Sequence, residues 1–247
     1  MSERRYNRVV VKLSGRAFAG DDPIGIDSDA LAHVAGEILS LQQLGVEVAA
    51  VVGGGNIFRG NVADDWNIER AEADNIGMLG TVINGLLLRG VLHAHGLEDV
   101  RVLTAVPITS MAEPYIRLRA LGHLERKKIV ILACGIGQPY VTTDYPAVQR
   151  AVELRADAVL VAKDGVDGVY DADPRTDPDA SRYTSVDYNG VLERGLKVMD
   201  QGAIILARDH GMPLHVFDFK RSGAMTALCR GENIGTEVAA GVATATA

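Results

Sequence analysis

The sequence has few of the features that mark secreted, membrane or nucleic-acid-binding proteins. Two cysteines in 247 residues, Cys134 and Cys229, are too few for a disulfide framework, and Cys134 is interpreted as a small core residue. No apolar run reaches membrane-spanning length, and the charged N-terminus leads directly into a predicted strand. The net charge of −7 argues against general nucleic-acid binding but does not exclude a basic nucleotide pocket. A reduced cytoplasm is the simplest setting.

Several catalytic signatures are also missing. The sequence has no G-x-x-x-x-G-K-[ST] loop, no H-R-D or D-F-G set, no G-x-G-x-x-G fingerprint and no G-x-S-x-G elbow. The six histidines and two cysteines lack metal-ligand spacing, so we expect no metal bound directly by the protein. These absences argue against a P-loop enzyme, a protein kinase, a Rossmann dehydrogenase and an α/β-hydrolase.

Apolar, β-branched runs alternate with helical patterns along the whole chain. Strands are predicted at residues 9–13, 46–52, 100–106, 129–133, 158–162 and 214–217. Helices are predicted at 30–44, 68–95, 143–155 and 199–210, and a surface loop at 164–179. This alternation predicts an α/β fold with a mainly parallel sheet covered on both faces. We expect one domain over residues 1–247, with an ordered core at about 8–238 and a fraying tail.

Three consecutive glycines, Gly53 to Gly55, follow the second predicted strand, and Arg59 comes four residues later. Without β-carbons, this loop could take positive φ and bring its N–H groups close to a ligand. An arginine offers a fixed fork of donors to a phosphate. A phosphate site is therefore favoured over a tight turn.

The ends of other predicted strands carry similar residues. Lys12 lies near the end of the first strand, the fourth ends before a glycine-rich segment, and Lys163 and Asp164 follow the fifth. Ligands of open α/β sheets bind beyond the carboxyl ends of the strands, so these residues should converge. Glycines and cations together suit phosphoryl transfer, in which the protein positions substrates and neutralises charge. The alternative for Lys12 is a lysine whose head reaches water from a strand end.

Seven ordered blocks, from about Val9 to Thr236, resemble the bacterial uridylate kinases of the amino acid kinase superfamily. The blocks are residues 12–15 (KLSG), 53–60 (GGGNIFRG), 77–85 (GMLGTVING), 137–144 (GQPYVTTD), 166–174 (VDGVYDADP), 196–200 (LKVMD) and 207–210 (ARDH). The resemblance implies a three-layer αβα sandwich, the amino acid kinase-like fold. It also implies transfer of the γ-phosphoryl group of Mg-ATP to UMP, giving UDP for pyrimidine nucleotide biosynthesis. A cytoplasmic homohexamer, activated by GTP and inhibited by UTP, would be usual.

The resemblance also assigns site residues. ATP would contact Lys12, Leu13, Ser14, Gly15, Gly55, Arg59, Asp164, Tyr170 and Asp173. UMP would contact Gly54, Asp74, Ile136, Gly137, Gln138, Pro139, Tyr140, Val141, Thr142 and Thr143. The catalytic group would be Lys12, Arg59, Asp144 and Asp200, although either aspartate could instead favour a helix start. A weaker effector assignment comprises Gly20, Asp21, Asp22, Pro23, Ile24, Gly25, His93, Arg101 and Arg117.

Three places depart from the family pattern. Arg16 stands where glutamate is usual, Asp164 where asparagine or threonine is usual, and Tyr145-Pro146 where small residues are usual. Four hypotheses therefore stay open. They are a UMP kinase, a paralogue for a modified nucleotide, a kinase acting on a carboxylate, carbamate or amino acid, and a non-catalytic nucleotide- or oxyanion-binding relative.

Overall fold

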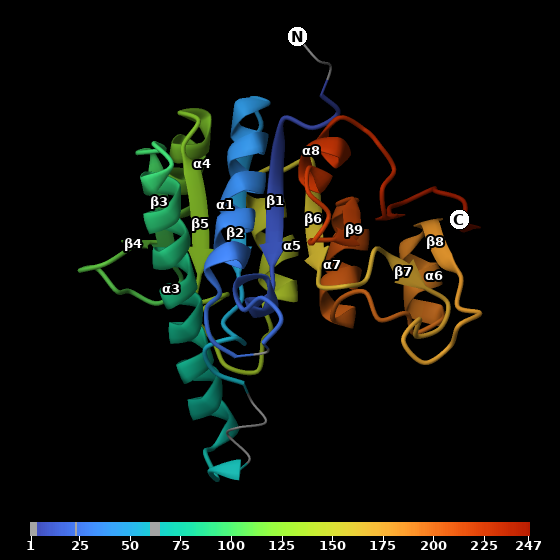
Figure 1. The fold of residues 1–247 in the computed structure, drawn as a ribbon, viewed down its shortest axis with the longest axis horizontal. Helices are drawn as coiled ribbons and strands as arrows, with labels where there is room; N and C mark the ends of the chain where they lie inside the picture. The colour runs from blue at the N-terminus through green and yellow to red at the C-terminus, as the bar shows by residue number, and fades with distance from the viewer. Residues whose placement is uncertain (1–3, 23, 60–64) are drawn as a thin grey trace.

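The computed structural model describes residues 4–22, 24–59 and 65–247. Its centre is a single 11-stranded sheet in the order β11-β8-β10-β9-β6-β1-β2-β5-β3-β4, with β7 paired to β8 (Figure 1). The strands are β1 (Arg8–Leu13), β2 (Glu47–Val52), β3 (Val100–Thr104), β4 (Glu113–Pro114), β5 (Ile129–Ala133), β6 (Ala158–Lys163), β7 (Val169–Tyr170), β8 (Arg182–Val186), β9 (Leu214–Asp218), β10 (Thr236–Val238) and β11 (Ala245–Thr246). The six central strands β3, β5, β2, β1, β6 and β9 are mutually parallel, which confirms the predicted mainly parallel sheet.

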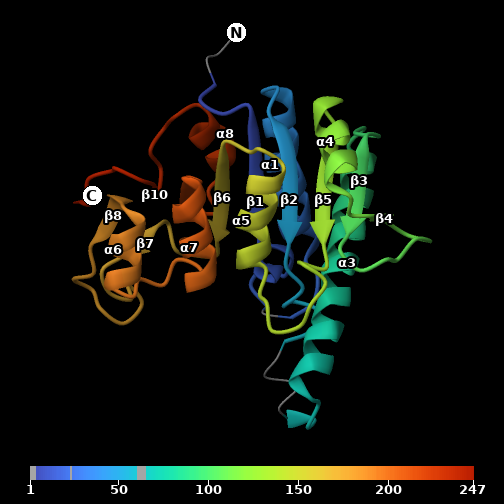
Figure 2. The ribbon, with the colours of Figure 1, turned by 180° about the vertical axis from the view of Figure 1, so that it is seen from behind.

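Helices cover both faces of this sheet, as the front and back views show (Figures 1 and 2). Helices α1 (Ser28–Gln43), α3 (Arg70–Ala94) and α8 (Ala224–Cys229) lie on one face, and α4 (Arg117–Glu125), α5 (Asp144–Glu153), α6 (Tyr188–Glu193) and α7 (Gln201–His210) on the other. A short 3-10 helix, η1 (Gly15–Phe18), follows β1. Asp27 caps α1 by accepting the N–H of Ala30, and Gly45 leaves its end with φ of +83°.

The alternation of side chains along β1 determines where its lysine lies. Val9, Val11 and Leu13 pack in the core beneath α1, α3 and α8, whereas Val10 packs beneath α5 and α7. Lys12 therefore shares its face with Val10 and lies toward the start of α5. The same alternation in β6 places Lys163 on the α5 and α7 side, after Val159 and Val161.

The C-terminal tail differs from its predicted fraying. Its strand β11 pairs antiparallel with β8, and the N–H of Ala247 donates to the carbonyl of Arg182 at 2.8 Å. The hydroxyl of Ser185 donates to the carbonyl of Ala243 at 2.7 Å. Backbone pairing orders this tail, and the small side chains of the tail gave no sequence signal for it.

Helix α3 lies within two residues of its predicted range. It is long and apolar enough to cross a membrane by length and composition only, a test that the core helix of a soluble protein also passes. Within α3, the side chains of Leu88 and Leu92 are fully buried, whereas those of Leu79 and Ile83 are 54% and 43% exposed. Its four glycines at positions 77, 80, 85 and 90 do not interrupt it. The helix thus packs one face on the sheet and leaves apolar side chains on its other face.

A buried histidine couples stability to pH. His215 in β9 is 4% exposed, and its Nε2 lies 2.7 Å from the hydroxyl of Tyr6. Burial lowers the pKa of His215 from 6.5 to about 4. Between these values the unfolded chain binds a proton that the native protein does not, so stability falls as pH decreases.

We therefore predict that the wild-type protein loses more stability between pH 7 and pH 5 than His215→Gln does. Glutamine can still bond Tyr6 but does not titrate. Urea denaturation at both pH values measures the two losses. Equal losses in the two proteins would rule out His215 as the cause.

Candidate active site

Three cavities line the carboxyl edge of the parallel strands. The glycine cavity, about 360 Å³, is lined by the triple glycine, α3 and the loop before α5. The tyrosine cavity, about 400 Å³, is lined by residues 163–175 with interruptions and by residues 194–197. The junction cavity, about 400 Å³, lies between them and is lined by Lys12, Ser14, Arg16, Arg59, Ala162, Lys163, Asp164 and Arg175.

Shared walls make these cavities neighbours. Ser14, Arg16 and Arg59 line both the glycine and junction cavities. Lys163, Asp164 and Arg175 line both the junction and tyrosine cavities. The two outer cavities are each of a size that suits a small ligand, and the one between them is rich in cations. Such an arrangement can hold two organic molecules with anionic groups meeting in the middle.

Space rather than backbone angle explains the first two of the three glycines, Gly53 and Gly54. Gly53, Gly54 and Gly55 all have φ outside the left-handed region, so the expected positive φ was wrong. A β-carbon on Gly54 would lie 2.4 Å from the carbonyl oxygen of Gly77, and one on Gly15 would lie 2.6 Å from the nitrogen of Gly55. Glycine therefore lets the loop after β2 touch both α3 and the loop after β1.

Two buried asparagines lock this contact. Asn56 and Asn84 are both fully buried. The amide of Asn84 donates to Asn56 and to the carbonyl of Gly53, both at 2.7 Å, and the amide of Asn56 donates to the carbonyl of Gly25 at 2.9 Å. Their mutual hydrogen bonds fix α3, the glycine loop and the segment near Gly25 as one unit.

Lys12 is 7% exposed and is held by a carboxylate. Its Nζ lies 2.7 Å from Oδ1 of Asp144, the first residue of α5. The other oxygen of Asp144 accepts the N–H of Asp200 at 3.1 Å, and the carboxylate of Asp200 accepts the hydroxyl of Thr142 at 2.5 Å. The structure thus brings together Lys12, Asp144 and Asp200, as predicted.

Lys163 adds a second, half-buried cation that the predicted set did not include. It donates to the carbonyl of Val198. Burial lowers the pKa of Lys163, and the charge of Lys12 lowers it further, whereas Asp144 and Asp200 raise it. Two lysines and two aspartates therefore interact electrostatically beside the junction cavity. The sequence signal for Lys163 as a site residue was its position at the end of a predicted strand.

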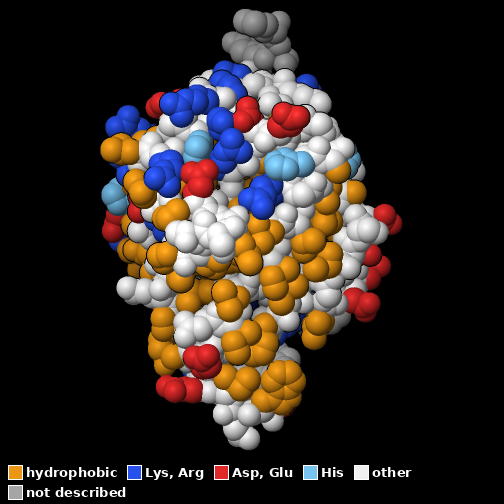
Figure 3. Space-filling model, turned by 90° about the vertical axis from the view of Figure 1, so that its left-hand side faces the viewer, with side chains coloured by type: hydrophobic (Ala, Val, Ile, Leu, Met, Phe, Trp, Pro, Cys, Tyr) orange, Lys and Arg blue, Asp and Glu red, His pale blue; other side chains and the backbone are white. Residues whose placement is uncertain are grey.

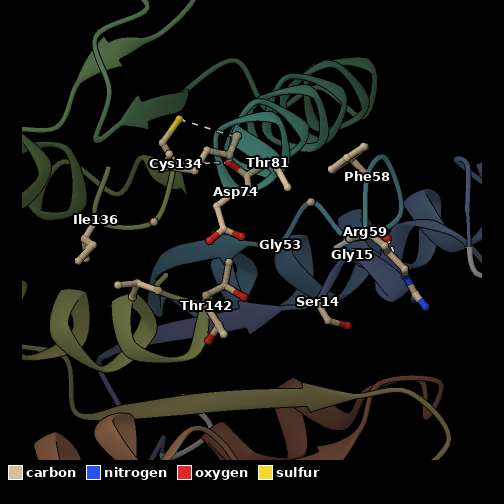
Figure 4. Close-up of a pocket in the computed structure, with 18 of the residues that line it drawn as sticks. Ser14, Gly15, Gly53, Phe58, Arg59, Asp74, Thr81, Cys134, Ile136 and Thr142 are labelled. Carbon is tan, nitrogen blue, oxygen red and sulfur yellow. Dashed lines mark hydrogen bonds between the residues drawn. The ribbon is translucent and has the colours of Figure 1, made fainter. Parts of the chain in front are cut away.

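The loop before α5 forms the far wall of the glycine cavity. Figure 4 shows Asp74 from α3 and Thr142 from this loop directed toward the same space. Asp74 accepts from Nε of Arg70 at 3.0 Å and from the N–H of Tyr140 at 2.8 Å, so it also anchors the loop. Ile136, Gln138, Val141, Thr142 and Thr143 line the cavity as predicted. Gly137, Pro139 and Tyr140 do not line it, and Tyr140 is 66% exposed.

Cys134 closes the inner end of the glycine cavity. Its N–H donates to the hydroxyl of Thr81 at 2.7 Å, the contact drawn in Figure 4. Burial raises the pKa of the Cys134 thiol, which disfavours the reactive thiolate. This agrees with its interpretation as a small core residue.

The tyrosine cavity contains Asp164, Tyr170 and Asp173 together. The hydroxyl of Tyr170 donates to Asp167 at 2.6 Å, and this bond raises the pKa of Tyr170. Arg175, Arg194 and Lys197 line the same cavity and were not predicted. In the sequence these three residues are charged residues in a loop or near a helix end, and such residues usually lie in solvent, so no sequence signal marked them as site residues.

Three residues assigned to ATP lie away from the junction and tyrosine cavities. Leu13 is fully buried in the core, and only its carbonyl reaches the site, where it accepts the N–H of Gly53 at 2.8 Å. Gly15 and Gly55 line the glycine cavity, not the junction or tyrosine cavities. Gly54 and Gly55 therefore line the same cavity. Gly60, in the same sequence block, lies outside the described residues.

The effector residues fall in separate places. His93 and Arg101 line an outer cavity of about 430 Å³ with Arg89, Ser110 and Glu113. Arg117 instead donates to the carbonyl of Glu153 at 2.7 Å and does not line that cavity. Gly25 lies beside Asn56 near the glycine loop, with Gly20, Asp21, Asp22 and Ile24 in the segment before α1. Pro23 lies outside the described residues.

Comparisons with known proteins identify the family. Residues 7–218 match the model of the amino acid kinase family. The chain belongs to the amino acid kinase family. It is 65% identical over 234 residues to the uridylate kinase of Frankia alni, covering 95% of this chain and 91% of the relative. It is 46% identical over 238 residues to that of Pediococcus pentosaceus, covering 96% and 98%.

Two solved structures of the same family share the fold. The UMP kinase of Bacillus anthracis matches with a TM-score of 0.96 and 52% identity, covering 99% of this chain and 100% of that one. The UMP kinase of Ureaplasma parvum matches with a TM-score of 0.89 and 34% identity, covering 95% and 99%. These matches confirm the predicted α/β fold of amino acid kinases.

The glycine packing gives a matched pair of variants. A β-carbon on Gly54 meets backbone atoms of Gly77 and Thr81 at 2.4 and 2.8 Å, whereas one on Gly55 meets only the Arg59 side chain at 4.0 Å. We predict that Gly54→Ala lowers stability by about 1–3 kcal/mol, as overpacking does, and that Gly55→Ala changes it by less than about 1 kcal/mol. Urea denaturation measures both. Equal effects of the two variants would contradict the packing explanation.

Proposed function

We propose that this chain is a UMP kinase that transfers the γ-phosphoryl group of ATP to UMP, giving UDP for pyrimidine nucleotide biosynthesis. The observation that carries the proposal is the cation-rich junction cavity between two cavities of ligand size. Relatives named uridylate kinase, at up to 65% identity over nearly the whole chain, support the same reaction. Residues 1–247 act as one domain in this proposal.

The chemistry follows from the residues of the junction cavity. The acceptor phosphate is already nucleophilic, so no strong base is required. The protein has to align two nucleotides and neutralise charge on the group that moves between them. Lys12 and Arg59 supply that charge, while Asp144 fixes the Lys12 ammonium at 2.7 Å and Asp200 supports Asp144 through its backbone N–H.

The two outer cavities take one nucleotide each. UMP occupies the glycine cavity, where Asp74, Gln138 and the hydroxyls of Thr142 and Thr143 offer polar groups to the nucleotide. ATP occupies the tyrosine cavity, where Tyr170 packs against the adenine. The γ-phosphoryl group then lies in the junction cavity. Ser14 and Arg59, which line both the glycine and junction cavities, brace it from the acceptor side.

Mg²⁺ would enter the site together with ATP. The described residues contain no group of three or more His, Cys, Asp or Glu side chains suited to a metal. Mg²⁺ often binds through one or two carboxylates together with substrate phosphates. Asp144 and Asp200 are the carboxylates placed for this, and Mg²⁺ would supply charge neutralisation of the phosphates.

We propose assembly into a homohexamer, and the exposed apolar face of α3 offers a surface for contact between subunits. Figure 3 shows hydrophobic side chains gathered across the middle of the face that carries α3 and the β3–β4 segment. Leu79, Ile83 and Met111 are 54%, 43% and 57% exposed. A contiguous apolar surface of this kind marks a protein interface. The outer cavity adjoins this face, and Arg89, His93 and Arg101 in it supply cations for the phosphates of GTP or UTP as effectors.

A cytoplasmic location accompanies this function. Cys134 and Cys229 are both free and buried, which suits a reducing compartment. ATP and UMP are the substrates, and neither nucleic acid nor membrane takes part.

We predict that the purified protein forms ADP from ATP and Mg²⁺ when UMP is supplied. A coupled ADP assay should compare UMP, CMP, dUMP and small carboxylates, each with and without GTP. Turnover with UMP should exceed that with the others, because the glycine cavity is built for one acceptor. No ADP formation with UMP would contradict the proposal, and preference for a modified nucleotide would indicate the paralogue.

Lys12 provides the matching test of the junction cavity. Lys12→Ala should lower kcat on the order of a hundred- to thousand-fold, the usual loss of one preorganised charge. The double variant Lys12→Ala with Asp144→Asn removes the unpaired carboxylate and should retain the fold by circular dichroism. Full activity of Lys12→Ala would show that the phosphoryl group does not pass this residue.

A further inference from the structure

Arg16 and Asp164 face each other across the junction cavity. Nε and Nη2 of Arg16 lie 3.1 and 3.0 Å from the same oxygen of Asp164, Oδ2. Arg16 belongs to η1, directly after the loop that follows β1, and it also lines the glycine cavity. Asp164 follows β6 and also lines the tyrosine cavity. The ion pair therefore spans the space between the two outer cavities.

Further cations surround this carboxylate. Oδ1 of Asp164 lies 3.4 Å from Nζ of Lys220, which also pairs with Asp21 at 3.3 Å. Nη2 of Arg175 donates to the backbone carbonyl of Asp164 at 3.5 Å. A carboxylate beside a phosphate-binding cavity would repel phosphates, and these cations neutralise that charge.

The two side chains of this ion pair contact each other in the wall of the junction cavity. The side chains are 32% and 23% exposed, so the ion pair alone adds little to stability. Because the two charges lie in a cavity wall, we expect them to interact with a ligand in the cavity.

Arg16 retains hydrogen-bonding capacity toward a ligand. A guanidinium has five N–H donors in a planar fork that matches phosphate oxygens. Asp164 engages Nε and Nη2, and within the described part of the chain the N–H groups of Nη1 have no hydrogen-bond partner. A phosphate in the junction cavity can therefore bind Arg16 while competing with Asp164 for it.

We propose that Arg16 is a phosphate-binding residue of the junction cavity and that Asp164 is a positioning residue that holds it there and restrains its affinity. The ligand class is the polyphosphate chain of the donor nucleotide. This inference rests on the proposed function, since it assigns a further contact to the same cavity. Removal of the carboxylate releases Arg16 to the phosphates, whereas removal of the arginine leaves Asp164 to repel them.

The test measures binding of inorganic tripolyphosphate by calorimetry, without any nucleoside. Arg16→Gln should weaken binding about tenfold, close to the loss of one charge-assisted hydrogen bond at a partly exposed site. Arg16→Lys should recover part of the loss because it keeps the charge without the fork. Asp164→Asn should tighten binding severalfold. Arg5→Gln, which breaks the Arg5–Glu237 pair far from these cavities, is the matched control and should change nothing.

The opposite signs separate the proposal from a structural role. If the pair only stabilised the fold, Arg16→Gln and Asp164→Asn would break the same contact and act in the same direction. Unchanged binding in both variants, or weaker binding in both, would overturn the proposal. ADP formation by the wild-type protein with UMP is measured in parallel. Its failure would overturn the proposed function, whereas wild-type turnover with unaltered tripolyphosphate binding in the variants would overturn this inference alone.

Discussion

The close contact of glycine backbones at the ends of β1 and β2 is the constraint on which the site depends. Gly15 approaches Gly55, and Gly54 approaches Gly77 of α3, at distances that leave no room for a β-carbon. This contact joins the loop after β1 to the loop after β2 and to α3. The buried Asn56–Asn84 pair then fixes the contact with hydrogen bonds. Without the contact of the glycine backbones, Arg59 and the floor of the glycine cavity would have no fixed position relative to Lys12.

The charges of the site form a balanced arrangement rather than a simple cationic patch. Lys12 pairs with Asp144, and Arg16 pairs with Asp164. The carboxylate of Asp200 accepts the hydroxyl of Thr142, and the backbone N–H of Asp200 donates to the carboxylate of Asp144. A lone buried lysine would be costly, and its partner carboxylate offsets that cost. The carboxylates of Asp144 and Asp164 hold Lys12 and Arg16 in place before any ligand enters. The arrangement is suited to phosphoryl transfer because each cation can interact with a phosphate without a large rearrangement.

The sequence predicted the parts of the structure that depend on periodicity and on strand ends. Strands β1, β2, β5 and β6 and helix α3 were found within two residues of their predicted bounds. The convergence of Lys12, Arg59, Asp164 and the loop before α5 followed from the parallel sheet alone. The reason for the triple glycine was wrong, since close packing against α3 is a tertiary contact that no local pattern reveals. The buried position of Leu13, the exposure of Tyr140 and the pairing of β11 likewise depend on which neighbour the folded chain provides.

We propose that phosphoryl transfer takes place in the junction cavity, with UMP on its glycine side and ATP on its tyrosine side. A crystal structure with a bisubstrate analogue, adenosine and uridine joined by a polyphosphate bridge, tests this most directly. We expect uracil against the loop before α5, adenine beside Tyr170, and bridging phosphates in contact with Lys12 and Arg59. Reversed nucleosides, or phosphates bound away from Lys12, would contradict it.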